Sequence, residues 1–311
     1  MDLTVAEPAV SQATDRAAWL NERKKGIGGS DVAAILGLSK WSTPFQVYAD
    51  KRGESEDKPG NVDMLIGTML EPWLFDEYKR VEGADIQKID EILYDKEYPF
   101  LFANVDGLRE DRVVEFKTAR DDSEWGQPGT DQCPAAYVLQ VQHYMRVADK
   151  PLCDLGVLFK SSRVPELVIY RIERDDELLG MVIPKLVEFW NCVVEGVAPA
   201  AISSDDATWK YKKSIPKSVD ATDEIDLALA ELKRVREQIK ELEFKESNLE
   251  GTIKEFMQTA DVLTSCGVVV TTWKSNRDGM KLDLDRLRAE QPDIVRKYSV
   301  EKPGARVFKV K

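Results

Sequence analysis

Two short stretches decide how this chain is read, Asn104-Val105-Asp106-Gly107 and Val114-Glu115-Phe116-Lys117. We expect both to lie in extended strands, the first within a strand over residues 101–108. Side chains alternate between the two faces of a strand, so Glu115 and Lys117 share one face. The chain therefore presents an acid on one strand and an acid–lysine pair on the next.

A hairpin would bring the two acids together. If Glu110-Asp111 is a two-residue turn, Arg109 pairs with Arg112 and Asp106 lies directly opposite Glu115. Tight hairpins favour Asn-Gly or Asp-Gly in the turn, and Glu-Asp is neither. An ordinary surface hairpin that happens to carry acids and a lysine is therefore the alternative interpretation.

Two carboxylates that face each other across a strand pair repel. A hard cation between them removes that cost, and Mg²⁺ is usually held by one or two carboxylates together with water and substrate phosphates. A nearby lysine can orient or deprotonate a metal-bound water. These are the parts of a phosphodiester hydrolase.

The composition limits the kinds of protein that this chain can be. The 311 residues suffice for one large domain or two, with 43% hydrophobic and 32% charged residues. No apolar run approaches membrane length, and the N-terminus has no signal-peptide pattern, so we expect no membrane association and a cytoplasmic location. The four cysteines are widely spaced, and one histidine excludes a site of several histidines. The net charge of −12 argues against coating nucleic acid by bulk charge.

A second candidate site lies near the N-terminus. Arg23-Lys24-Lys25 precedes a glycine-rich segment that leads into a predicted short helix over residues 32–36. Backbone N–H groups and the helix dipole at such a position favour an anion, so a phosphate pocket is one interpretation. An ordinary helix capped by Ser30 or Asp31 is the other.

Glu71 is an acid in an apolar setting. On a helix it shares a face with Leu74, Phe75 and Tyr78, where an acid must be paired or bind a metal. The alternative is a capping box, because Thr68 precedes Glu71 by three residues and could open the helix.

Gln140 poses a similar question. We expect a helix over residues 134–148, in which Gln140 shares a face with Tyr137, Val141 and Tyr144. A buried glutamine needs hydrogen-bond partners. It is either structural or reaches the acids of the hairpin.

The remaining elements indicate a mixed α+β fold. We expect strands over residues 152–159 and 167–172 and a helix over residues 175–194. The C-terminal part should contain a strand over residues 267–273, a helix over residues 283–297 and a last strand over residues 305–310, the two strands pairing with each other. We expect a domain over residues 1–215, a long helix within residues 216–259 and a small appendix over residues 260–311.

The long helix, expected over residues 222–258, has apolar residues at alternating steps of three and four. This is a heptad pattern, typical of a coiled coil, which only Glu246 interrupts. The helix could pair with another chain, fold back on its own domain or contact a partner. The apolar positions are Ile225, Ala228, Leu232, Val235, Ile239, Leu242, Leu249, Ile253 and Phe256.

Taken together, the motifs resemble the lambda-exonuclease-like (YqaJ-type) viral recombinase family of the PD-(D/E)xK nuclease superfamily. Each motif is weak alone, but five occur in the family's order, and together they cover roughly residues 16–195. The matching stretches are residues 28–37, 67–71, 105–107, 115–117 and 137–142.

The resemblance implies a PD-(D/E)xK core, in which a central mixed sheet is flanked by helices, and a role for each site residue. Asp106, Glu115, the Phe116 carbonyl and Glu71 would hold one or two Mg²⁺ ions, with Mn²⁺ as the alternative. Lys117 would activate the attacking water. Gln140 would support the site from its helix.

The resemblance also implies a contact with the 5′-phosphate of the substrate. Arg23 and Ser30 match the positions that hold this group. Asn104 stands where the family often has a further serine. Val105 replaces the proline of the superfamily signature.

The implied activity is a Mg²⁺-dependent 5′→3′ exonuclease that digests linear double-stranded DNA and leaves 3′ single strands. The partners would be duplex DNA ends, a single-strand annealing protein and further copies of the chain, as a trimer. The origin would be a phage or prophage in a bacterial host. Two alternatives stay open: an endonuclease or RecB-like nuclease of the same superfamily, and a non-catalytic scaffold that binds DNA ends.

Overall fold

The computed structural model describes residues 21–55, 62–89, 91–161, 166–301 and 304–310. The chain divides into two compact units, residues 1–210 and residues 211–311, and each is described by itself. Among the described residues, none of the helices combines the length and the apolar character that spanning a membrane requires.

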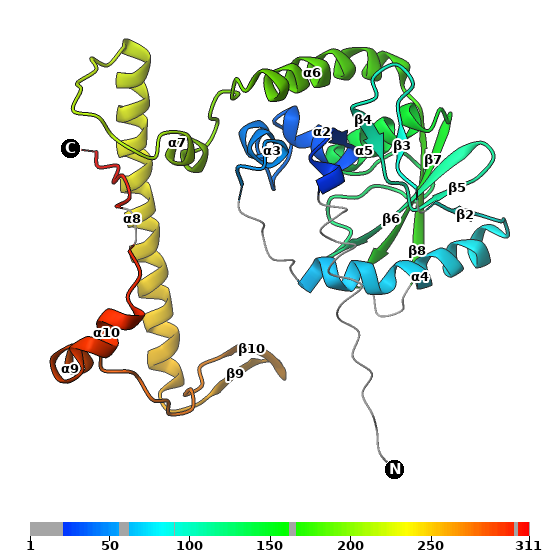
Figure 1. Cartoon of the computed structure of the whole chain (residues 1–311). Coiled ribbons are helices and arrows are strands. Elements are labelled where there is room, and N and C mark those ends of the chain that lie inside the picture. Colours follow the sequence, from blue (N-terminus) through cyan, green and yellow to red (C-terminus); the bar gives the residue numbers. More distant parts are fainter. Residues whose placement is uncertain (1–20, 56–61, 90, 162–165, 302–303, 311) are drawn as a thin grey trace. The chain divides into compact units, whose positions relative to one another are not determined.

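A five-stranded mixed sheet forms the centre of the first unit (Figure 1). Its middle strands, β6 and β7, are parallel, and the other neighbours are antiparallel. The strand order is β2 (Gln87–Lys88), β5 (Gly107–Leu108), β6 (Arg112–Ala119), β7 (Leu152–Phe159) and β8 (Leu167–Glu173). The predicted strands over residues 152–159 and 167–172 are confirmed.

Helices cover both faces of this sheet. Alternate residues of β6 therefore pack into two different hydrophobic cores. Val114 and Phe116 pack with Leu74 and Tyr78 of α4 (Val62–Glu82). The opposite face belongs to the larger core, which includes residues of α5 (Ala135–Val147). The expected mixed α+β core, with its sheet between helices, is confirmed.

A second, three-stranded sheet has the order β1 (Ile27–Gly28), β4 (Leu101–Ala103) and β3 (Leu93–Tyr94). The predicted continuous strand over residues 101–108 is therefore wrong. The chain leaves the small sheet after β4 and joins the large sheet only at β5. Residues 104–106 make this crossing, and Asp106 is its last residue.

Further helices in the described part of the first unit are α2 (Gly29–Ile35), α3 (Pro44–Lys51), α6 (Asp176–Glu195) and α7 (Ser204–Lys210). α2 packs against α5, and α6 packs against α2, α3 and α5. The helices expected over residues 134–148 and 175–194 are confirmed as α5 and α6.

Two expected helix starts are wrong. The cap of α2 is Gly28, and its N–H donates to the Asp31 carboxylate at 3.0 Å, so neither Ser30 nor Asp31 is the capping residue. Helix α4 already runs from Val62, which puts Thr68 and Glu71 inside it and excludes a capping box there.

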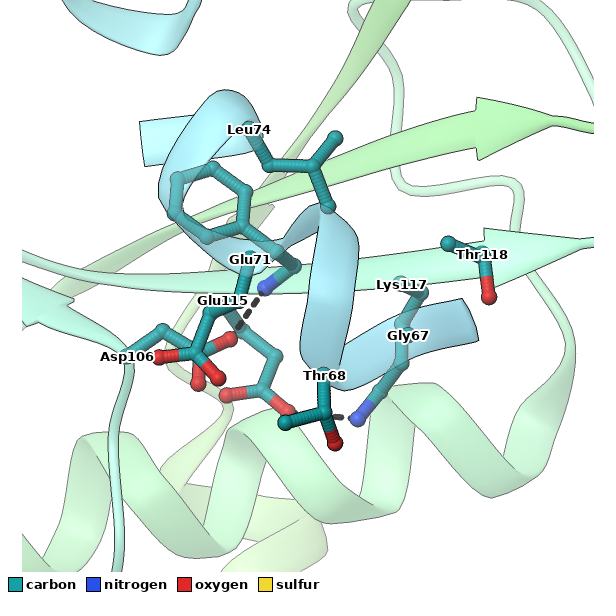
Figure 2. Close-up of a pocket in the computed structure, with 9 residues that line it drawn as sticks. Gly67, Thr68, Glu71, Leu74, Asp106, Glu115, Lys117 and Thr118 are labelled. Atoms are coloured by element: carbon teal, nitrogen blue, oxygen red, sulfur yellow. Dashed lines mark hydrogen bonds and ion pairs between the residues drawn. The ribbon is translucent and has the colours of Figure 1, made fainter. Parts of the chain in front are cut away.

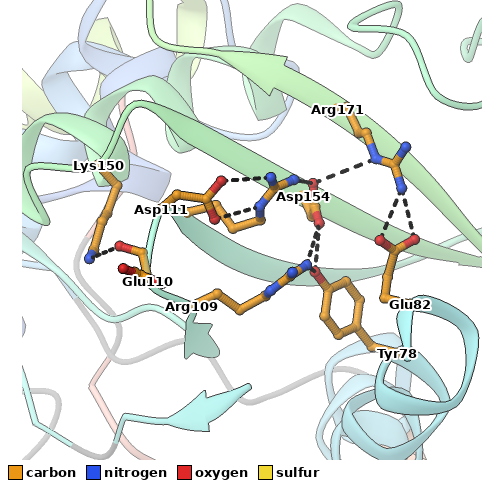
Figure 3. A network of polar contacts seen from close by, with 9 residues as sticks. Tyr78, Glu82, Arg109, Glu110, Asp111, Lys150, Asp154 and Arg171 are labelled. Carbon is orange, nitrogen blue, oxygen red and sulfur yellow. Dashed lines mark hydrogen bonds and ion pairs between the residues drawn. The ribbon is translucent and has the colours of Figure 1, made fainter. Parts of the chain in front are cut away.

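A buried carboxylate ties α4 to the sheet. Asp154 of β7 is fully buried and accepts hydrogen bonds from Tyr78 Oη at 2.5 Å and from Arg112 at 2.8 Å (Figure 3). Arg109 and Arg171 lie near the same carboxylate, at 3.7 and 4.0 Å. A buried charge needs such partners, and here the partners come from three different elements.

The second unit contains the long helix α8 (Asp223–Met257), which is capped by Thr222. The helix expected over residues 222–258 is confirmed. Strands β9 (Val262–Ser265) and β10 (Val268–Thr272) form an antiparallel hairpin. The last helices are α9 (Leu284–Glu290) and α10 (Pro292–Tyr298).

The tail differs from the prediction in two ways. β10 pairs with β9 and not with residues 305–310, which form no strand. Cys266 and Gly267 both have positive φ, of 50° and 79°, which suits a tight hairpin between adjacent segments. The single helix expected over residues 283–297 is broken at Pro292, which has no N–H to continue α9 and instead begins α10.

Candidate active site

The strand register places the two acids opposite each other, as predicted. Gly107 pairs with Val114, and Leu108 pairs with Val113. Arg109 N–H donates to the Arg112 carbonyl at 2.9 Å, which closes the turn over residues 110–111. Continuing this register by one residue sets Asp106 against Glu115.

The acids open into a cavity of about 150 Å³ between α4 and the edge of the strands (Figure 2). Figure 2 shows the carboxyl groups of Glu71, Asp106 and Glu115 directed into the same space, with Lys117 beside them. The lining residues are Gly67, Thr68, Glu71, Leu74, Asp106, Glu115, Phe116, Lys117 and Thr118.

Hydrogen bonds fix the two central acids. Asp106 Oδ2 accepts from the Phe116 N–H at 2.7 Å. Glu115 Oε1 accepts from Lys117 Nζ at 2.5 Å and from Gln140 Nε2 at 3.0 Å. Gln140 therefore reaches the hairpin from α5, which decides between its two interpretations. It also donates to Tyr144 Oη at 2.9 Å.

The two acids are buried with few groups to stabilise their negative charge. Glu115 is 3% exposed, and its Oε2 is buried without a hydrogen-bond partner. Burial, together with the nearby charge of Glu115, raises the pKa of Asp106 to about 8. Burial also raises the pKa of Glu115, although Lys117 opposes the shift. Both groups resist ionisation because burial disfavours their charged forms more than the nearby Lys117 favours them.

Lys117 is a cation in this arrangement. Burial by itself would lower the pKa of its amine, but Glu115 and then Asp106 outweigh burial and raise the pKa above its ordinary value. The amine also lies over the Tyr137 ring, 5.8 Å from its centroid. Lys117 here donates a hydrogen bond to Glu115 and supplies the positive charge closest to the acid pair.

The donor set fits a hard divalent cation. Within the described parts of the chain, no three Asp, Glu, His or Cys side chains form a ready-made metal cage. Glu71 lies on the cavity wall, but its side chain is 39% exposed and lies 3.5 Å from Lys88 Nζ. Two carboxylates, one with an unpartnered oxygen, leave several positions for water and phosphate, as Mg²⁺ requires.

A second cluster brings together the residues predicted for the 5′-phosphate. Arg23 Nη2 donates to Ser30 Oγ at 3.1 Å and to Asp31 at 3.3 Å. Lys51 Nζ donates to the same Asp31 at 2.6 Å and to the Arg23 carbonyl at 2.7 Å. Asn104, in contrast, is half-buried and does not line the cavity.

Sequence reasoning missed how Asp31 and Lys51 act in this cluster. Burial would raise the pKa of Asp31, but Lys51 and Arg23 outweigh it and lower the pKa below its ordinary value. The carboxylate therefore stays ionised and holds Arg23 beside Ser30. Lys51 lies 20 residues further on and on another helix, so no local pattern links it to Asp31.

Tyr144 contacts residues of both clusters. Gly29 packs so closely on this ring that an added Cβ would lie 2.5 Å from Tyr144 Cε1. The Tyr144 hydroxyl accepts from Gln140, which in turn donates to Glu115. A short chain of contacts thus joins the start of α2 to the acid pair.

Comparison with known proteins identifies the family. The profile of the YqaJ-like viral recombinase domain matches residues 18–151. Uncharacterized protein YqaJ of Bacillus subtilis (strain 168) is 33% identical over 309 residues, which cover 94% of this chain and 93% of the relative. The chain belongs to the YqaJ-like viral recombinase family.

Solved structures also resemble this YqaJ-like chain. An alkaline exonuclease from Laribacter hongkongensis matches with a TM-score of 0.49 and 20% identity, over 58% of this chain and 93% of that one. A putative exonuclease from Eubacterium rectale matches with a TM-score of 0.49 and 13% identity, over 69% and 97% of the two chains.

Removing one charge from the acid pair should stabilise the metal-free YqaJ-like chain. Because the pKa of Asp106 is raised to about 8 in the folded state, its ionised form destabilises the fold. The resulting loss in the free energy of unfolding grows as pH rises from about 4 to about 8, and it reaches its full size above about pH 8. Asp106→Asn should raise the thermal midpoint in EDTA at pH 8 by roughly 2–4 °C, which corresponds to about 1 kcal/mol.

Differential scanning fluorimetry between pH 5 and pH 9 measures this difference. Asp76→Asn is the matched control, because Asp76 is exposed on α4, and it should leave the midpoint unchanged at every pH. A gain for Asp106→Asn that is equal at pH 5 and pH 9 would contradict the assignment of the penalty to ionisation.

The contact between Gly29 and Tyr144 should be intolerant of a methyl group. Gly29→Ala forces the ring to shift, and we expect a loss of about 1–3 kcal/mol in the free energy of unfolding. Gly180→Ala is the control, because nothing lies within 4 Å of its added Cβ inside α6, and it should gain about 0.5–1 kcal/mol. Urea unfolding measures both, and equal effects would argue against a close contact at Gly29.

Proposed function

We propose that this protein is a Mg²⁺-dependent deoxyribonuclease that digests linear double-stranded DNA in the 5′→3′ direction. The 3′ single strands that it leaves would serve phage-type recombination by strand annealing. One observation carries the proposal: Asp106, Glu115 and Lys117 converge on one small cavity in which the acids lack sufficient positive charge. Membership of a viral recombinase family supports it.

Asp106 and Glu115 would hold the metal with their carboxylates, and the Phe116 carbonyl and Glu71 would complete the protein's contribution. When bound, Mg²⁺, or Mn²⁺ in its place, supplies a Lewis acid for the phosphate and lowers the pKa of a bound water. Two opposed carboxylates would otherwise repel the phosphate that has to enter the cavity.

The chain's own residues then have separate tasks. Gln140 fixes the orientation of Glu115 through its 3.0 Å hydrogen bond, so the carboxylate need not reorganise during the reaction. Lys117 lies at the same carboxylate and can orient the attacking water or exchange a proton with it. Without metal, the contact with Glu115 raises the pKa of Lys117 and keeps its amine protonated. Lys117 could therefore act as a base only after this contact is weakened.

The start of α2 would select the DNA end. Arg23 and Ser30 form a donor pair that suits a terminal 5′-phosphate, and Asp31 and Lys51 hold Arg23 in place. The net charge of −12 fits an enzyme that grips a few phosphates locally. The partners would be duplex DNA ends, a single-strand annealing protein and further copies of this chain, in the cytoplasm of a bacterial host.

A duplex with one 5′-phosphorylated and one 5′-hydroxyl end, incubated with Mg²⁺ beside a closed circle, tests the proposal. We expect loss of the strand that begins at the phosphorylated end, with the circle intact. Glu115→Gln should reduce the rate by about 10²–10³-fold or more, because it weakens the cation site. Lys117→Met should reduce it by about 10²-fold.

Arg23→Ala should lower the rate at the phosphorylated end and leave the hydroxyl end unchanged. Arg80→Ala is the matched control, because this arginine is exposed on α4 and pairs with Glu77, and it should act like the wild type. Nicking of the circle would favour an endonuclease. DNA binding without cleavage in Mg²⁺ or Mn²⁺ would favour a non-catalytic protein that binds DNA ends.

A further inference from the structure

Helix α8 carries an apolar seam that the described residues of its own unit leave largely exposed. The helix has 35 residues, and its seam follows five heptads. Leu242, Leu249 and Phe256 are 62%, 66% and 76% exposed, and Ile225, Ile239 and Ile253 are also exposed. A regular apolar stripe of this length marks an interaction surface, because a lone helix gains little stability without a packed face.

The heptad positions define the seam. Ile225, Leu232, Ile239, Glu246 and Ile253 occupy the first apolar position of successive heptads. The second apolar position holds Ala228, Val235, Leu242, Leu249 and Phe256. Apart from Glu246, both positions carry apolar side chains, which is the pattern that the seam of a coiled coil requires.

We propose that α8 pairs with α8 of a second copy of this chain, as an antiparallel two-stranded coiled coil. This inference is independent of the nuclease activity. Aligning the helices antiparallel about their centre sets Ile239 against Leu242 of the second copy. It also sets Leu232 against Leu249 of the second copy, so the apolar layers match along the seam.

The charges that flank the seam fit the same alignment. Glu231 would lie opposite Lys245 of the second copy, and Arg236 opposite Glu250 of the second copy, each contact occurring twice by symmetry. Within one chain, Glu231 binds Arg234 and Glu250 binds Lys254. These are exposed pairs of small energy, so the acids can turn toward the second helix.

Glu246 decides the orientation. In a parallel pair the two Glu246 side chains would meet inside the seam, where like charges are costly. In the antiparallel pair Glu246 lies opposite Val235 of the second copy and next to its Arg236. The remaining like-charge contact, between the two copies of Glu243, lies on the solvated rim, where repulsion is weak.

Sedimentation of the full chain tests the pairing. We expect particles of twice the mass of those formed by Leu242→Asp, because this variant buries two carboxylates in the seam and weakens pairing by roughly 100-fold or more. Phe244→Asp is the matched control, because Phe244 is also apolar and 68% exposed but lies on the outer face. It should keep the wild-type mass. Circular dichroism confirms that both variants stay helical.

A single cysteine tests the orientation. A short bismaleimide should crosslink Glu243→Cys between residues 243 of two copies, because these residues lie on the same flank of the seam only in the antiparallel pair. Each maleimide adds one thiol, so the reaction needs no oxidant. Peptide mapping separates this crosslink from crosslinks of the native cysteines, among which Cys266 is exposed. Equal masses for wild type and Leu242→Asp, an equal loss in Phe244→Asp, or no crosslink between residues 243 would each overturn the proposal.

Discussion

The opposition of two carboxylates at the centre of the molecule is the constraint on which the site depends. The register of β5 and β6 sets Asp106 against Glu115, and burial raises the pKa of both. Neighbouring elements hold this unfavourable arrangement in place. Asp154 ties α4 to β6 through Tyr78 and Arg112, and Gln140 of α5 binds Glu115. The fold thus holds together two carboxyl groups that resist ionisation, and a bound cation would favour their charged forms.

Much of the fold could be predicted from local pattern. β7, β8, α5, α6 and α8 lie close to their predicted bounds, because each has strong periodicity or a clear cap. The errors occur where the chain changes direction. No residue pattern within 101–108 indicates that the chain crosses from one sheet to the other there. The tail has only weak hydrophobic patterns, so the sequence did not predict that β9 pairs with β10 through a turn with positive φ.

The site was predictable where it depends on register and spacing. Asp106 and Glu115 meet because the turn at residues 110–111 is as short as supposed, and Gln140 reaches them from the expected face of α5. The contacts of Asp31 with Lys51 and of Gly29 with Tyr144 were not predictable. They join residues far apart in the sequence through side-chain packing, for which a single sequence carries no signal.

The central claim is that the acid pair is a site for a divalent cation, and calorimetric titration of the full chain with Mn²⁺ in the absence of DNA tests it most directly. We predict one or two saturable ions per chain, with binding weakened at least about tenfold in Glu115→Gln and unchanged in Glu241→Gln, an exposed acid of α8. Absence of binding, or equal binding by the wild type and Glu115→Gln, would contradict the account.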